Sequence, residues 1–196
     1  VLFMRVFLSV LILIFSLQSW TKADDIRDFE IESMSIGDSL LDYFNETEIQ
    51  NSQRYDNTTG FTSNKFFQLR IKKKGQYEEI LIGLKTDDKL YKIYSLSGTV
   101  KYENNISDCY NKKKEIEEEF KTLFKKAKIS RQDKDSHPAD KSGKSIVAST
   151  YFDLISGDYV SIECYDWTKE MGYWDNLRIG IISKTFGDWL TYEAYK

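Results

Sequence analysis

The sequence predicts an α+β fold in which helices cover one face of an antiparallel sheet or sheets. Two groups of three strand-like runs are joined by short turns, which favours antiparallel hairpins over crossovers. An amphipathic segment with helical spacing precedes each group. The predicted order is helix–three strands, repeated twice, and then a short C-terminal helix. The length suits one domain over 24–196, built either as one unit or as two similar halves, 24–108 and 109–196, which share one sheet or form two lobes.

In the first half, the stretch FEIESMSIGDSLLDYFNETEI (29–49) predicts a helix that opens near Ser35. Its apolar residues recur on one helix face: Ile36, Leu40, Leu41 and Phe44. Ser35 followed by Asp38 resembles a capping box, and Asp38 also suits the positive end of the helix dipole. Asp38 and Asp42 would share a face, so a carboxylate pair is conceivable there. Capping and solvation explain both acids, and residues 45–48 end the helix or start a short extra turn.

The strands of the first half follow a polar run, 50–64, that is expected to be a loop. Segments 66–73, 77–85 and 90–102 are rich in Tyr, Ile, Leu and Val and are separated by turn residues. The second half opens with the clearest helix, 111–128. Its apolar residues form one stripe: Ile116, Phe120, Leu123, Phe124 and Ala127.

Residues 130–145 contain no large apolar side chain and hold the only proline and the only histidine. We expect a mobile surface loop in which His137 is solvated. Segments 145–154, 159–167 and 176–184 then predict three more strands. Thr185 with Asp188 resembles a second helix cap, so a short terminal helix is expected to follow.

The N-terminal segment predicts export. Arg5 precedes an apolar run at 6–17, and a small residue, Ala23, ends the segment. This order is typical of a cleaved signal peptide over residues 1–23. The alternative is a membrane anchor, but the run is shorter than the roughly 20 residues that span a bilayer. We therefore expect a periplasmic or secreted protein with no membrane span after cleavage.

The chain has two cysteines, Cys109 and Cys164. In an oxidising compartment a single pair is most simply a disulfide. The alternative, a metal site or a Cys–His dyad, would have to use His137, the only histidine. We expect the structural disulfide and no metal site.

Composition and motifs exclude several classes of function. The chain carries 31 acidic and 28 basic residues, so nucleic-acid binding, which needs a basic stripe, is disfavoured. It contains no G-x-S-x-G, H-E-x-x-H, C-x-x-C or Gly-rich phosphate loop. We therefore expect no cofactor and assign no catalytic residue.

A resemblance adds to these predictions. The stretch from Met34 to Phe44, with its Met-Ser-Ile-Gly opening, and the order of helix and strands resemble small exported SmpA/BamE modules and the tandem β-lactamase-inhibitor fold. The chain departs from them in lacking a lipoprotein cysteine and in placing three strands after one helix. It is also similar to small exported bacterial proteins of unknown function. The resemblance implies a binding or scaffolding role and transfers no functional residue.

One stretch stands out as a candidate site. Residues 164–175, CYDWTKEMGYWD, place four large aromatic residues around a turn: Tyr165, Trp167, Tyr173 and Trp174. Exposed aromatic rings can stack on sugars or contact a partner, whereas the alternative is that they complete the core. The preferred hypothesis is a non-enzymatic binding module whose partner is an envelope protein or a glycan. The alternative is an exported glycan hydrolase with a carboxylate pair.

Overall fold

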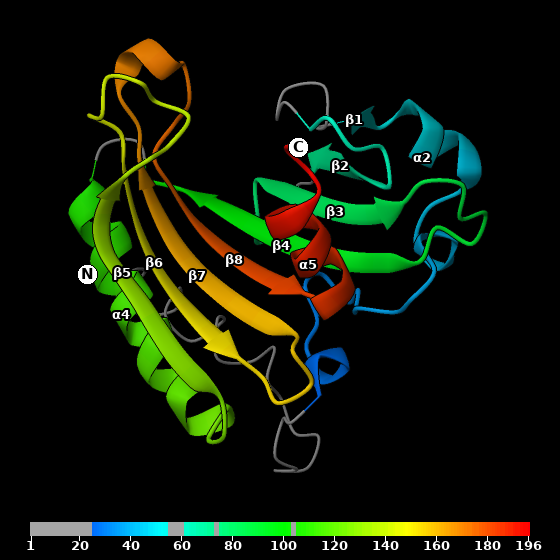
Figure 1. The fold of residues 1–196 in the computed structure, drawn as a ribbon, viewed down its shortest axis with the longest axis horizontal. Helices are drawn as coiled ribbons and strands as arrows, with labels where there is room; N and C mark the ends of the chain where they lie inside the picture. The colour runs from blue at the N-terminus through cyan, green and yellow to red at the C-terminus, as the bar shows by residue number, and fades with distance from the viewer. Residues whose placement is uncertain (1–24, 55–60, 73–74, 103–104) are drawn as a thin grey trace, which may run out of the picture.

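One antiparallel sheet organises the molecule (Figure 1). The computed structural model describes residues 25–54, 61–72, 75–102 and 105–196. The sheet has eight strands in the order β1-β2-β3-β4-β8-β7-β6-β5. They span Gln53–Arg54 (β1), Phe66–Lys72 (β2), Glu79–Lys85 (β3), Ile93–Lys101 (β4), Lys128–Ser136 (β5), Ile146–Asp153 (β6), Tyr159–Asp166 (β7) and Asn176–Ile182 (β8). Strands β4 and β8 pair, so the two groups of strands share one sheet, and the α+β class is confirmed.

Helix α4 (Ile106–Leu123) packs on one face of the sheet. Its predicted stripe is confirmed for Ile116 and Phe120, which are buried, and the buried Phe124 follows at the end of the helix. Phe120 and Phe124 contact the rings of Phe29 and Phe152. The main core therefore joins α4, the N-terminal segment and strand β6. The helix begins and ends five residues earlier than predicted, and the chain from Lys128 onward pairs with β6.

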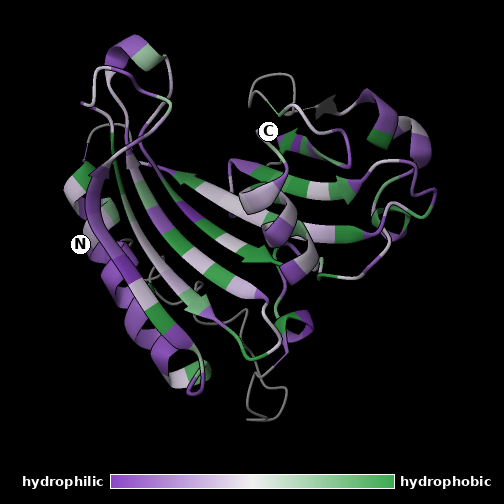
Figure 2. Ribbon diagram, viewed as in Figure 1, coloured by the Kyte–Doolittle hydropathy of each residue, from purple (hydrophilic) through white to green (hydrophobic). Residues whose placement is uncertain are grey.

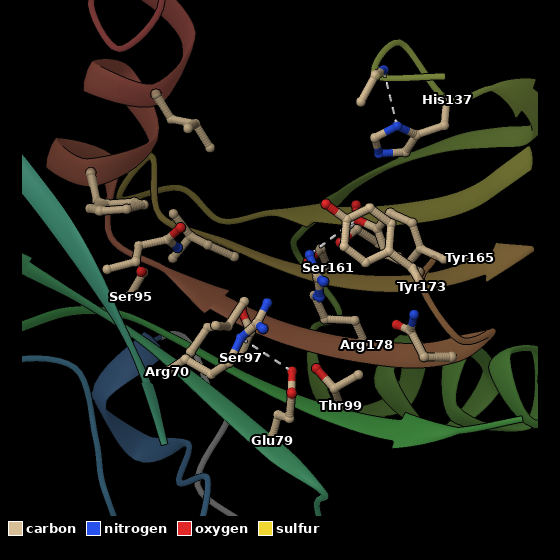
Figure 3. A pocket seen from close by; sticks show the side chains of 18 of the residues that line it. Arg70, Glu79, Ser95, Ser97, Thr99, His137, Ser161, Tyr165, Tyr173 and Arg178 are labelled. Atoms are coloured by element: carbon tan, nitrogen blue, oxygen red, sulfur yellow. Dashed lines mark hydrogen bonds and ion pairs between the residues drawn. The ribbon is translucent and has the colours of Figure 1, made fainter. Parts of the chain in front are cut away.

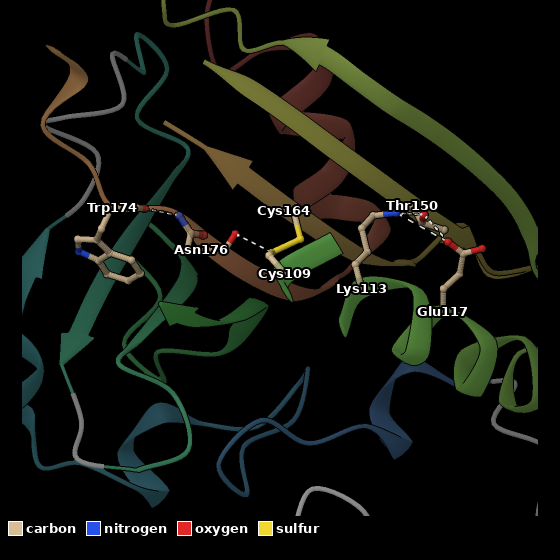
Figure 4. Close-up of a disulfide and its surroundings, with 7 residues drawn as sticks. All are labelled: Cys109, Lys113, Glu117, Thr150, Cys164, Trp174 and Asn176. Carbon is tan, nitrogen blue, oxygen red and sulfur yellow. Dashed lines mark hydrogen bonds and ion pairs between the residues drawn. A yellow bond between two sulfur atoms is a disulfide. The ribbon is translucent and has the colours of Figure 1, made fainter. Parts of the chain in front are cut away.

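The predicted disulfide between Cys109 and Cys164 is confirmed (Figure 4). The two Cα atoms are 6.1 Å apart, within the range for a disulfide. Both residues are fully buried. The bond ties the first turns of α4 to strand β7, and Cys109 Sγ lies 3.5 Å from the carbonyl oxygen of Asn176 on β8.

The opening segment differs from the helix predicted near Ser35. It contains a 3-10 helix at Leu40–Asp42 and then α2 (Glu46–Asn51), which corresponds to the short extra turn. Asp38 does accept a hydrogen bond from the Ser35 amide, at 2.9 Å, but no helix follows directly. The amides of Gly37 and Leu40 donate to the carbonyls of Ile93 and Tyr91, so pairing with the sheet replaces the first helical turns. The full capping box lies later, between Asn45 and Glu48.

Strand β5 corrects the first part of the predicted loop at 130–145, whereas residues 137–145 do form turns and irregular structure. It pairs with β6 and forms one edge of the sheet, and most of its residues are exposed. Figure 2 shows it as hydrophilic along most of its length. An edge strand needs no apolar face, and charged residues protect such an edge from pairing with other chains. The sequence therefore lacked the apolar alternation that marks the other strands.

Helix α5 (Lys184–Tyr192) corrects the prediction that helices cover only one face. Its cap is Ser183, not Thr185, because the Ser183 side chain accepts from the Phe186 amide. Phe186 and the fully buried Trp189 pack with Phe66 in a second, smaller core. A Cβ atom at Gly83 on β3 would lie only 2.6 Å from a carbon of the Phe186 ring, so glycine permits this close approach. Helix α5 thus lies over part of the face opposite α4.

The expected signal peptide, residues 1–23, lies outside the described residues. Among the residues that the structure describes, no helix is long and apolar enough to cross a membrane.

Candidate functional site

The face of the sheet opposite α4 carries a groove of about 420 Å³ (Figure 3). Strands β2, β3, β4, β8, β7 and β6 supply its floor, α5 contributes to one end, and the loops after β5 and β7 contribute aromatic residues. We call this the open-face groove. Its lining includes Gln68, Arg70, Glu79, Leu81, Ser95, Ser97, Thr99, His137, Tyr151, Tyr159, Ser161, Glu163, Tyr165, Trp167, Tyr173, Trp174, Asn176, Arg178, Phe186 and Leu190.

Strand alternation explains why the floor is polar. Successive side chains of a strand point to opposite faces. On β4 the polar side chains Ser95, Ser97 and Thr99 line the groove. On β7 the sequence YVSIECYD places Tyr159, Ser161, Glu163 and Tyr165 in the groove and Val160, Ile162 and Cys164 in the core below α4. This alternation is visible in the sequence and could have identified Tyr159, Ser161 and Glu163 as floor residues; of the β7 groove residues, only Tyr165 was predicted.

Strand register brings three of the four charged residues of the floor into one row, whereas Arg70 on β2 lies opposite Leu81 in the next row. Glu79 on β3 lies opposite Thr99, Thr99 lies opposite Arg178 on β8, and Arg178 lies opposite Glu163 on β7. This second row has small residues at its centre, Ser97, Gly180 and Ser161, and larger side chains toward its ends. These small residues leave depth in the middle of the floor, beside the charged row.

The charges of the floor are matched within the protein. Arg70 and Glu79 form an ion pair with 3.5 Å between Nε and the carboxylate. Arg178 lies 4.7 Å from the centre of the Tyr165 ring and donates to the Tyr165 hydroxyl at 3.5 Å. That hydroxyl lies 3.1 Å from a Glu163 oxygen, to which it donates. The lining thus holds two arginines and two glutamates, which balance.

Tyrosine hydroxyls hold the Glu163 carboxylate in place. Tyr151 donates to one oxygen at 3.0 Å and Tyr165 to the other at 3.1 Å. Burial, and then the nearby Glu163 charge, raise the pKa of Tyr151 and of Tyr165 well above the usual value for tyrosine. Burial likewise raises the pKa of Tyr159 to about 12. The hydroxyls therefore stay protonated at neutral pH and act as donors.

The four predicted aromatic residues all line the open-face groove. Tyr165 is buried at the base and stacks on Trp167, with ring centres 5.7 Å apart and planes 6° apart. The ring centre of Tyr173 lies 4.9 Å from that of Trp167, and Tyr173 is 47% exposed. Trp174 is half-buried, with the Lys101 ammonium 4.9 Å from its ring centre. One ring is therefore structural, and the other three form an aromatic wall (Trp167, Tyr173 and Trp174).

His137, which was expected to be solvated, is instead half-buried against this wall. Its ring centre lies 4.4 Å from that of Trp167 and 5.7 Å from that of Tyr165. Burial and the positive charge of Arg178 lower the pKa of His137, which favours the neutral imidazole. A histidine without apolar neighbours in the sequence gives no local sign of such a contact.

Asp140 fixes the loop that carries His137. Its carboxylate accepts hydrogen bonds from the amides of Ser142 and Ser145 at 2.9 Å and from the Ser145 hydroxyl at 2.6 Å. The Thr168 amide in turn donates to Ser145 at 3.1 Å. These bonds, led by those from Ser145 and Ser142, lower the pKa of Asp140. The two loops of the aromatic wall are therefore joined to each other.

Two buried polar atoms at the floor have no hydrogen-bond partner among the described residues: Thr99 Oγ1 and Asn176 Oδ1. Thr99 is 3% exposed and Asn176 is 4% exposed, and both line the groove. The other end of the Asn176 amide is used, since its nitrogen donates to the Trp174 carbonyl at 3.0 Å. Buried polar groups are nearly always hydrogen-bonded, so these two are exceptions that need an explanation.

The described residues of the groove contain neither a metal-binding cluster nor a close pair of carboxylates. Among the described residues, no group of three or more His, Cys, Asp or Glu side chains is placed to hold a metal ion. The two groove carboxylates, Glu79 and Glu163, are three strand spacings apart, roughly 14 Å between Cα atoms. Each already bonds to neighbouring side chains. A carboxylate-pair hydrolase therefore stays the weaker hypothesis.

In comparisons with known proteins, no family model, no curated protein and no solved structure matches the chain. The resemblance to SmpA/BamE and inhibitor-like modules stays a prediction.

Proposed function

We propose that the protein is an exported, non-enzymatic module that binds a small polar ligand in the open-face groove. The observation that carries this proposal is a polar floor with matched charges below an aromatic wall, on a sheet face that α5 covers only in part. Ligand sites are typically clefts of about 300–1,000 Å³ with a few well-placed polar groups. The groove, at about 420 Å³, falls within this range.

Rigidity supports binding more than catalysis. Glu163 is held by two tyrosines, Glu79 by Arg70, and the wall loops by Asp140. A preformed site loses little conformational entropy when a ligand binds. These hydrogen bonds and this ion pair already engage both carboxylates, whereas a general acid or base must reach the reacting group of a substrate.

Export is supported by the sequence of residues 1–23 and by the buried disulfide. Disulfides persist mainly in oxidising compartments. We therefore place the protein in the periplasm or outside the cell, with a glycan or another envelope component as its ligand.

A matched pair of tyrosine variants tests the proposal. Tyr173 lines the groove and is 47% exposed, whereas Tyr192 on α5 is 62% exposed and is not part of the groove lining. The oxidised chain from residue 24 is mixed with the low-molecular-weight fraction of an envelope extract and examined by native mass spectrometry. We expect the parent and Tyr192→Ala to bind the same compound, seen as the same added mass. The dissociation constant of that compound should be about 5- to 30-fold higher for Tyr173→Ala.

The proposal is wrong if the parent retains no added mass. It is also wrong if Tyr173→Ala retains the ligand as tightly as the parent does, because the ligand would then bind elsewhere. Turnover of the retained compound would instead favour the hydrolase.

A further inference from the structure

We propose that the ligand of the open-face groove is a neutral hydroxylated ring, a sugar unit, which hydrogen-bonds to Thr99 and Asn176 and lies against Tyr173 or Trp174. This inference rests on the proposed function and names the class of ligand. Three independent features of the groove support it: its unpartnered polar atoms, its charge balance and its shape.

The unpartnered atoms define the hydrogen bonds that a ligand must make. Asn176 Oδ1 can only accept, so the ligand must donate to it. Thr99 Oγ1 is a hydroxyl and can donate or accept. A ligand hydroxyl group can also do either, so it satisfies both atoms, whereas a carboxylate cannot donate to Asn176.

The strand register places these two atoms within reach of one ring. Thr99 pairs with Arg178, and Lys101 pairs with Asn176, on the neighbouring strands β4 and β8. Thr99 and Asn176 are therefore diagonal neighbours on one face, roughly 7 Å apart. Two hydroxyl groups of one sugar ring can therefore approach both residues at once.

The charge balance favours a neutral ligand. Within the lining, Arg70 pairs with Glu79, and Arg178 reaches Glu163 through the Tyr165 hydroxyl. The two arginines and two glutamates cancel. A ligand with net charge would lose hydration on entering the groove without meeting an unmatched opposite charge, which is costly.

The shape of the groove suits a ring with one apolar face. The small side chains of Ser97, Gly180 and Ser161 form the middle of the floor. Tyr173 and Trp174 stand on the wall beside Asn176. The face of an aromatic ring carries partial negative charge, and the C–H groups on one side of a sugar ring carry partial positive charge. The two surfaces therefore attract each other.

Probes that share one ring test the class of ligand. Glucose, glucuronate and glucosamine differ mainly in charge, and galactose, mannose and N-acetylglucosamine extend the neutral set. Binding is measured by isothermal titration calorimetry with the oxidised chain from residue 24. We expect at least one neutral sugar to bind about ten-fold more tightly than glucuronate and glucosamine, the two charged probes. Cellotetraose and laminaritetraose show whether a free unit or a glycan segment is preferred.

A matched pair of threonine variants tests the site. Thr99 lies at the groove floor without a partner, whereas Thr150 lies on the opposite face and hydrogen-bonds Lys113 at 2.5 Å and Glu117 at 3.0 Å. Both are buried, and Val matches Thr in shape. Thr99→Val should weaken sugar binding about ten-fold without lowering the melting temperature, and Thr99→Ser should restore binding. Thr150→Val should lower the melting temperature and leave the affinity unchanged.

Each outcome is decisive. The inference fails if no neutral sugar binds, if a charged probe binds more tightly, or if Thr99→Val binds as the parent does. When the protein retains an extract compound that only a charged probe displaces, the binding function stands and the sugar inference is wrong. When neither extract nor probe binds, both are wrong.

Discussion

Removal of the disulfide between Cys109 and Cys164 should lower the stability of the fold by a large and calculable amount. The bond joins α4 to β7 at two fully buried positions, and its residues are 55 apart in sequence. In the unfolded chain it closes a loop of that length and so reduces the conformational entropy. The chain-entropy relation gives about 4 kcal/mol at 25 °C for such a loop.

Two forms of the protein separate the cross-link from the packing of the sulfur atoms. The reduced parent keeps both sulfurs and loses only the bond, whereas Cys109→Ala with Cys164→Ala also loses sulfur contacts in the core. Urea unfolding at pH 7, followed by tryptophan fluorescence, compares each with the oxidised parent. We expect the reduced parent to lose up to about 4 kcal/mol and the double variant somewhat more.

A loss of less than about 1 kcal/mol in the reduced parent would refute this reasoning. The slope of the unfolding free energy against urea should also increase without the bond, because an unrestrained unfolded chain exposes more surface. An unchanged slope with an unchanged midpoint would show that the cross-link does not restrain the unfolded state.

Two further predictions concern the buried Glu117 carboxylate and the N-terminus. Burial raises the pKa of Glu117, but hydrogen bonds from Arg131, Thr150 and Lys121 outweigh it and lower the pKa from 4.5 to about 2. The ionised Glu117 carboxylate therefore adds about 3 kcal/mol to the free energy of unfolding above pH 4.5, and this stabilisation is lost as the pH falls toward 2. Glu117→Gln should be less stable by about that amount at pH 7, with the difference closing in acid; parallel pH profiles in urea unfolding would contradict this. Intact-mass measurement of exported protein should show a chain that begins at residue 24, and a retained segment 1–23 would rule out the predicted cleavage.

The elements that could be predicted are those whose signal is local. The helix stripe of Ile116 and Phe120 fixes which side of α4 is buried, whatever it packs against. Alternation marks strands such as β7, where Val160, Ile162 and Cys164 are all buried. A disulfide between two cysteines needs no choice of partner, so Cys109–Cys164 could be paired from the sequence.

The predictions that were wrong involve backbone bonds to distant segments. The opening helix near Ser35 is replaced by bonds from Gly37 to Ile93 on β4 and from Leu40 to Tyr91 just before β4, which compensate for the helical bonds that are not formed. Strand β5 pairs with β6 through backbone hydrogen bonds, and its charged side chains protect its free edge from pairing with other chains. It therefore shows no apolar pattern. Its position at the edge depends on the order of all the strands.

The sequence by itself determined the fold class, the buried face of α4, the disulfide and the aromatic cluster around Tyr173, because each depends on spacing along a short stretch or on a unique pair. Only the tertiary structure decided that Thr99, Arg178 and Glu163 lie in one row, that His137 joins the wall, and that α5 lies on the face opposite α4. The physical reason is that the groove is assembled by strand register across segments far apart in the chain. Register follows from the packing of the whole sheet, and no local pattern specifies it.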